Sequence, residues 1–184
     1  MGRFPYPAWE DKNFAAAGKP TINVFKLLSY SPETVELWTS IGNAHFTRIN
    51  FSKKDRELII LLSSAKFRSY YEWTHHIPLS TKFGVTDKQR NELRNAAKVK
   101  GYFSEAYWKE NKANFDTKEQ VLLTFLEAII DFGEVDEAIW QKATETFSKR
   151  QIMEMLTMQG FYYTLSRVTT VLKIDMEGNL KPRL

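Results

Sequence analysis

A short apolar run that follows a helix-start signal constrains the fold of this chain more than any other feature. Ser52 stands where a side chain can cap a helix, and Asp55, Arg56 and Glu57 occupy the first turn after it. The residues that follow are apolar on almost every side of a helix, namely Leu58, Ile59, Leu61, Leu62 and Ala65. A helix that is apolar all round has to be covered by other elements, so this run predicts a central buried helix.

Helical spacing and helix-end signals recur along the rest of the chain. Pro32 and Glu33 open a helix whose apolar positions lie at helical spacing. Further helices are predicted over 71–83, 86–101, 117–132, 136–147 and 148–174, and three of these begin with a Thr-x-x-Gln or Ser-x-x-Gln capping box. No segment alternates between apolar and polar residues with turn signals at its ends. We therefore expect an all-α fold, a compact helical bundle.

The length of the chain, 184 residues, suits one domain over 1–184 with a sizeable core. Its first part, 1–21, is rich in Pro, Gly and aromatic residues and predicts an extended arm. The last part, 175–184, is expected to be a tail. Its final residues, Pro182-Arg183-Leu184, only distantly resemble a peroxisomal signal, so a cytoplasmic location is expected and a peroxisomal one is the minor alternative.

Composition excludes several classes of function. The chain has no cysteine, which rules out disulfides, thiolate metal ligands and thiol redox chemistry. The net charge of +4 comes from Lys and Arg scattered among acidic residues, so no nucleic-acid partner is expected. No apolar run approaches the ~20 residues of a membrane span, and no membrane association is expected.

Two carboxylates and one imidazole stand out because they lie in segments that predict buried helices. Glu72 and His76 are four residues apart and share one face of a helix, which is the minimum for general acid–base work. A structural interpretation exists for each carboxylate. Ser69-x-x-Glu72 is itself a capping box, and Glu57 is placed to interact with a helix N-terminus and with Arg56.

The spacing of these residues resembles the carboxymuconolactone decarboxylase and alkylhydroperoxidase-D-like superfamily. The motif of its peroxidase branch, Glu-x11-Cys-x-His-Cys-x3-His, falls on Glu57, Ser69, Tyr71, Glu72 and His76, so both cysteines and the middle histidine are replaced. Glu72 and His76 reproduce the Glu-x3-His of the decarboxylase branch. The surrounding Tyr-Glu-Trp-x-x-His motif looks like that of a subgroup of these relatives. The resemblance spans 32–174 and implies an alkylhydroperoxidase-D-like bundle that forms a homo-oligomer, a trimer or a hexamer.

The resemblance also implies roles for individual residues. Glu57, Glu72 and His76 are the predicted catalytic residues, with Glu57 holding the histidine. Tyr71, His45, Tyr162 and Arg167 are predicted to bind substrate, although a tyrosine or a lone histidine on an apolar face is more often part of a core. His75 is expected at the surface or at a subunit interface.

Neither a metal site nor a cofactor motif is predicted. His75, His76 and Glu72 offer at most two usable ligands from one helix face, and no Gly-rich nucleotide-binding motif is present.

These features together predict a cofactor-free lyase or isomerase. His76 is expected to move a proton to or from carbon in a small carboxylated lactone or a related cyclic metabolite. The alternative is a non-catalytic helical oligomer that acts as a binding or scaffold protein, with the same three residues as a structural network. A cavity beside His76 distinguishes the two, because a structural network would be sealed.

Overall fold

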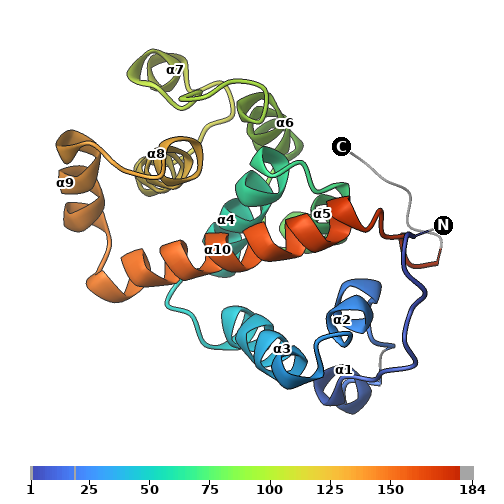
Figure 1. Ribbon diagram of the computed structural model, residues 1–184. Helices are drawn as coiled ribbons and strands as arrows, with labels where there is room; N and C mark the ends of the chain where they lie inside the picture. Colours follow the sequence, from blue (N-terminus) through green and yellow to red (C-terminus); the bar gives the residue numbers. More distant parts are fainter. Residues whose placement is uncertain (1, 19, 179–184) are drawn as a thin grey trace.

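The apolar run after Ser52 forms α4 (Lys53–Lys66), which lies at the centre of the molecule (Figure 1). The computed structural model describes residues 2–18 and 20–178. Within these residues it has nine further helices: α1 (Lys12–Ala16), α2 (Asn23–Leu28), α3 (Pro32–Thr47), α5 (Tyr70–Lys82), α6 (Asp87–Ala96), α7 (Glu105–Glu110), α8 (Thr117–Phe132), α9 (Glu137–Thr146) and α10 (Lys149–Val171). The described part of the chain contains no strand, so the predicted all-α fold is confirmed.

The burial of α4 follows from its local sequence. The Ser52 hydroxyl accepts the backbone N–H of Asp55 at 3.0 Å, as predicted for a helix cap. Every residue of α4 from Asp55 to Ala65 is buried. The helix packs against α5, α6, α8 and α10, so its apolar residues meet a neighbouring helix on each side.

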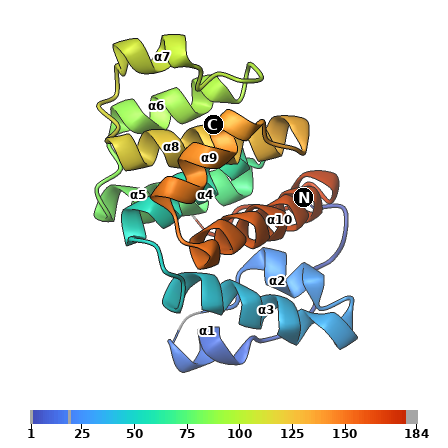
Figure 2. The same cartoon turned by 90° about the vertical axis from the view of Figure 1, so that its left-hand side faces the viewer.

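The other helices form layers on either side of the long α10. In both views α1, α2 and α3 lie together on one side of α10, and α6, α7 and α8 lie on the other (Figures 1 and 2). α4 and α5 are packed side by side along α10, and α9 packs against α8. The three helices α4, α5 and α10 therefore meet where the layer of α1–α3 covers them.

The helix boundaries differ from the predicted ones by a few residues. The capping box of α8 is made by Asp116 and Glu119, one residue earlier than the predicted box at Thr117. α6 ends at Ala96 rather than near Gly101, and α10 ends at Val171 rather than near Ile174. At the end of α5, Gly84 has a φ of +89°, a conformation that suits glycine after a helix.

Three short helices were not predicted. The segment 1–21, expected as an extended arm, contains α1, whose start is capped by the Asp11 carboxylate. α2 has no side-chain cap. Three of its four apolar residues are buried against the rest of the molecule, so packing rather than a local signal explains this helix. α7 has six residues between a Ser104 cap and Asn111 in the left-handed conformation. Helices this short are marginal alone and depend on tertiary contacts.

The beginning and the end of the described chain lie against each other. The N–H of Arg3 donates to the Leu172 carbonyl at 2.8 Å, and the N–H of Asn23 donates to the Glu177 carboxylate at 2.6 Å. The predicted tail 175–184 therefore begins as a packed segment. Its remainder, 179–184, which includes the sequence compared with a peroxisomal signal, lies outside the described residues. No helix in the described part of the chain is long and apolar enough to cross a bilayer.

Candidate active site

His76 lies where α4, α5 and α10 meet, and each of the three helices contributes one side chain. Its Nδ1 is 2.8 Å from a carboxylate oxygen of Glu57 on α4. Its Nε2 is 3.2 Å from the hydroxyl of Tyr162 on α10. All three residues are buried. The structure thus brings together three of the predicted site residues, although they are separated by up to 105 positions in the sequence, from Glu57 to Tyr162.

Glu57 is fully buried and holds its charge through two partners. Arg56 donates to one carboxylate oxygen from Nε at 3.0 Å and from Nη2 at 2.8 Å, while His76 contacts the other oxygen. Burial alone would raise the pKa of the Glu57 carboxyl, but His76 and Arg56 together lower it. An ionised Glu57 accepts a hydrogen bond, so Nδ1 of His76 carries the proton and Nε2 is left as the basic nitrogen.

The surroundings of the Glu72 carboxyl group differ from those of Glu57. The Ser69 hydroxyl caps α5 by accepting the N–H of Glu72 at 3.3 Å. In a complete capping box the Glu72 side chain would in turn accept the N–H of Ser69. That N–H instead donates to the Ser64 carbonyl. One carboxylate oxygen, Oε1, has no hydrogen-bond partner among the described residues. Burial raises the pKa of Glu72 to about 7, against the opposing charges of His76 and His75. Near neutral pH this carboxyl group can therefore donate or accept a proton.

Glu72 and His76 both face a cavity of about 550 Å³. Its walls come from α1, α2, α3, α5 and α10, and from the loops beside α1 and α2. The polar residues of the lining are Asp11, Asn13, Thr39, Asn43, Glu72, His75, His76 and Tyr162. The other residues of the lining are Phe14, Ala17, Ile22, Val24, Phe25, Gly42, Phe46, Leu79, Phe161 and Leu165. This volume is in the range of sites that bind small molecules.

Two neighbours of Glu72 on α5 are tied to the C-terminal segment: Tyr71, one residue before it, and His75, three residues after it. The Tyr71 hydroxyl donates to Glu177, and His75 Nε2 is 2.7 Å from the other oxygen of the same carboxylate. Burial and the charge of Glu177 raise the pKa of Tyr71. Tyr71 does not line the cavity, whereas His75 does. The structure therefore gives Tyr71 a packing and hydrogen-bonding position rather than the predicted contact with a substrate.

His45 and Arg167, both predicted to bind substrate, also lie away from the cavity lining. His45 is buried edge-on against the Phe161 ring, with ring centroids 5.1 Å apart, and burial lowers its pKa. Arg167 is on the exposed side of α10, where it donates to the Phe67 carbonyl and stacks 5.4 Å from the centroid of the Tyr163 ring. Arg167 is five residues after Tyr162 and lies on another face of α10. Its guanidinium is therefore not placed to hold a substrate carboxylate in the cavity, the role that the resemblance suggested for it.

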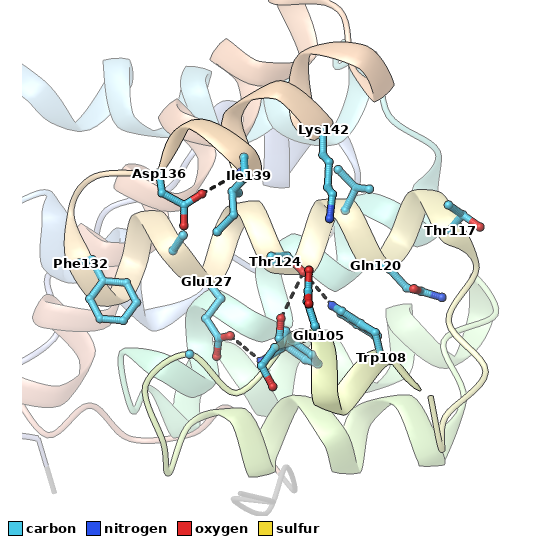
Figure 3. A pocket seen from close by; sticks show the side chains of 16 residues that line it. Glu105, Trp108, Thr117, Gln120, Thr124, Glu127, Phe132, Asp136, Ile139 and Lys142 are labelled. Carbon is cyan, nitrogen blue, oxygen red and sulfur yellow. Dashed lines mark hydrogen bonds between the residues drawn. The ribbon is translucent and has the colours of Figure 1, made fainter. Parts of the chain in front are cut away.

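A second cavity, of about 480 Å³, lies between α7, α8 and α9. Figure 3 shows that Thr124 and Glu127 on α8 point into it from one wall and that Asp136 and Lys142 flank it on the side of α9. Glu127 is already ion-paired to Lys66 at 2.6 Å. None of the predicted site residues lines this cavity.

The described residues contain no group of three or more His, Asp or Glu side chains arranged to hold a metal ion.

Sequence reasoning missed the contribution of the N-terminal segment and of the aromatic walls. Phe14 on α1 and Asp11, which caps α1, belong to the lining. The only sequence signal of α1 is this Asp at a helix-cap position. Phe46 and Phe161 also face the cavity, and Phe46 lies over the Arg56 guanidinium at 4.4 Å. Phenylalanines at helical spacing carry no signal that separates a cavity wall from a core.

Comparison with known proteins supports the fold. No protein-family model matches the chain, and no curated protein matches it. Solved structures do match it, among them the following two. One is an uncharacterized peroxidase-related protein from Ralstonia eutropha, described as an alkylhydroperoxidase AhpD core, with a TM-score of 0.72 and 17% identity over 100% of this chain and 93% of that one. The other is an uncharacterized peroxidase-related protein from Silicibacter, with a TM-score of 0.69 and 18% identity over 97% of this chain and 93% of that one.

Proposed function

We propose that this chain, which has the alkylhydroperoxidase-D-like fold, is an acid–base enzyme that moves a proton between carbon atoms of a small cyclic carbonyl compound. The observation that supports this most directly is the arrangement of His76 and Glu72. A histidine oriented by an ionised carboxylate and a carboxyl group with a pKa near neutrality face the same cavity.

His76 is the proposed base. Glu57 keeps the proton on Nδ1, so Nε2 has the free lone pair, which accepts the Tyr162 hydroxyl in the absence of substrate. A substrate carbonyl that takes over the Tyr162 hydrogen bond frees Nε2. The nitrogen then removes a proton from the carbon next to that carbonyl and leaves an enolate.

Tyr162 and Glu72 are the proposed acids. Burial raises the pKa of Tyr162 well above its ordinary value, so the phenol stays protonated and donates to the enolate oxygen. Glu72, in its protonated form, can return a proton to a different carbon of the same substrate. Removal at one carbon and return at another is a double-bond isomerisation, which needs both an acid and a base.

Decarboxylation, the other reaction expected for relatives of this type, is the less favoured proposal. It requires a substrate carboxylate, and Arg167, the residue expected to hold one, bonds to a backbone carbonyl outside the cavity. Thiol-dependent peroxide reduction is also disfavoured, because the chain has no cysteine.

The test is turnover of β,γ-unsaturated cyclic ketones and lactones, followed by the absorbance of the conjugated product. The His76→Ala variant should lose about 10²–10⁴-fold in turnover, the range for removal of a general base. Glu57→Gln should lose less, because it acts through the orientation of His76. Arg167→Gln, on α10 and outside the cavity lining, is the control and should turn over like the unmodified protein.

The non-catalytic alternative, a binding or scaffold oligomer, makes a different prediction for the same proteins. Glu57 would serve only stability, and His76→Ala would lower the melting temperature by leaving a buried carboxylate short of a partner, at a cost of about 1–3 kcal/mol. Wild-type turnover in His76→Ala, or no turnover above heat-denatured protein with any compound, would overturn the proposed enzyme.

A further inference from the structure

We propose that the cavity beside His76 selects uncharged, largely apolar carbonyl compounds and discriminates against carboxylates. This inference rests on the proposed function, because it assigns a substrate class to the same site. The proposed substrate class is narrower than the one expected from the sequence, which included carboxylated lactones.

The first observation is the aromatic wall. Four phenylalanines from four different helices line the cavity: Phe14 on α1, Phe25 on α2, Phe46 on α3 and Phe161 on α10. Phe14 and Phe25 lie with their ring centroids 5.9 Å apart, and the Phe46 ring is 5.8 Å from that of His76. A ligand beside His76 is therefore surrounded by aromatic rings, which favour the burial of apolar rings.

The second observation is the balance of charge. Two carboxylates, Asp11 and Glu72, belong to the lining. Asp11 is held in place, because its side chain accepts the N–H groups of Asn13 at 2.9 Å and Phe14 at 3.1 Å. A carboxylate ligand in the cavity would therefore meet the Asp11 carboxylate and, above the pKa of Glu72 of about 7, a second group of its own sign.

Each nearby side chain that can carry a positive charge already has a carboxylate partner. His75 lies 2.7 Å from Glu177, His76 lies 2.8 Å from Glu57, and Arg56 donates to Glu57 as well. Neither Lys nor Arg belongs to the lining formed by the described residues. An anionic ligand would lose its hydration without gaining an unpaired cation, and transfer of a charge out of water is costly unless it is paired.

The third observation is a hydrogen-bond donor that suits a carbonyl oxygen. Oε1 of Glu72 has no hydrogen-bond partner among the described residues, although Glu72 is buried and faces the cavity. The Tyr162 hydroxyl, on α10, belongs to the same lining and lies 3.2 Å from Nε2 of His76. A protonated carboxyl group and a phenol can each donate to a neutral carbonyl, whereas an ionised Glu72 would repel a carboxylate.

Binding rather than turnover tests this inference. The probes are α-tetralone and the carboxylate of the same ring system, 1,2,3,4-tetrahydro-1-naphthoate, each titrated into the full chain at pH 7.5 by calorimetry. We expect the ketone to bind and the carboxylate to bind at least about tenfold more weakly, which corresponds to about 1.4 kcal/mol.

Two matched variants test whether Asp11 causes the preference for the ketone over the carboxylate. Asp11→Asn removes a charge from the cavity but keeps an oxygen that can cap α1, so the preference for the ketone should shrink. Asp136→Asn is the control, because Asp136 caps α9 through the Ile139 N–H in the same way and lies outside this cavity. It should leave the preference unchanged.

The failure of this inference is distinguishable from the failure of the proposed function. Equal or tighter binding of the carboxylate, no binding of either probe, or an unchanged preference in Asp11→Asn would overturn the inference. Binding of the ketone with the expected preference, but no proton exchange at its α-carbon in deuterium oxide, would overturn the proposed function and leave the ligand class standing.

Discussion

Glu57 and Glu72 show how neighbours at the scale of single residues divide two buried carboxylates into different roles. Both are buried, but Glu57 has Arg56 and His76 as partners, and its pKa is lowered. Glu72 has an oxygen without a hydrogen-bond partner among the described residues, and burial raises its pKa to about 7. Two carboxyl groups whose pKa values are driven apart are what an acid and a supporting base require.

The raised pKa of Glu72 predicts a dependence of stability on pH. Its pKa is about 7 in the folded protein and 4.5 in an unfolded reference, so between these values the folded state binds more protons and stability falls as the pH rises. Glu72→Gln should therefore match the unmodified protein near pH 5 and be more stable at pH 8, by up to roughly 3 kcal/mol.

The measurement is chemical unfolding of both proteins from pH 5 to 8. Glu134→Gln, at an exposed carboxylate after α8, is the control and should show no such change. A Glu72→Gln variant that gains no stability with rising pH would contradict the assignment of a raised pKa.

At the scale of elements, the site depends on how closely α3 approaches α10. Gly42 on α3 lies opposite Phe161, and a Cβ atom at that position would be 3.1 Å from the end of the Phe161 ring and 3.5 Å from that of Phe25. Two aromatic walls of the cavity thus pack directly against a residue without a side chain. Gly160, one residue before Phe161 on α10, has no heavy atom within 4 Å of a Cβ position.

These two glycines make a matched pair. Gly42→Ala should displace the Phe161 ring, lower stability by about 1–3 kcal/mol through overpacking, and weaken ligand binding. Gly160→Ala should raise stability by about 0.5–1 kcal/mol, because alanine favours a helix and nothing obstructs it. Thermal unfolding measures both, and a Gly42→Ala protein as stable as Gly160→Ala would rule out the close approach.

At the scale of the whole molecule, one face of α10 leaves large apolar side chains in contact with solvent. Met153 is 59% exposed, Leu156 is 36% exposed and Tyr163 is 49% exposed, and their spacing places them on one side of the helix. Large apolar side chains gathered on one exposed helix face are typical of contacts between subunits.

We therefore propose that a homo-oligomer assembles through this face; the trimer or hexamer is what the family resemblance of the sequence implies. Leu156→Glu should shift the mass measured by light scattering towards the monomer, because a buried unpaired charge opposes association. Leu37→Glu, at an exposed leucine on α3, is the comparison and should not. A monomeric unmodified protein at micromolar concentration, or dissociation by Leu37→Glu alone, would contradict the proposed interface.

The absence of cysteine predicts a property of the whole chain. Consumption of alkyl hydroperoxide coupled to a dithiol or thioredoxin-like donor should not exceed that of heat-denatured protein in metal-free buffer, because no thiolate is present to attack the peroxide. Donor-dependent peroxide turnover well above that control would show that another group performs the reaction.

The sequence by itself determined the all-α class, most of the helices, the central position of α4, and the separation of Glu72 and His76 by one turn. These properties are local: caps, apolar spacing and the helical repeat depend on residues a few positions apart. Tertiary packing alone decided that Tyr162 lies against His76, that Arg167 lies on the outer side of α10 and that α1 covers the cavity. It also shifted the pKa values of Glu57 and Glu72 in opposite directions. Those outcomes depend on burial and on neighbours distant in sequence, which no local pattern records.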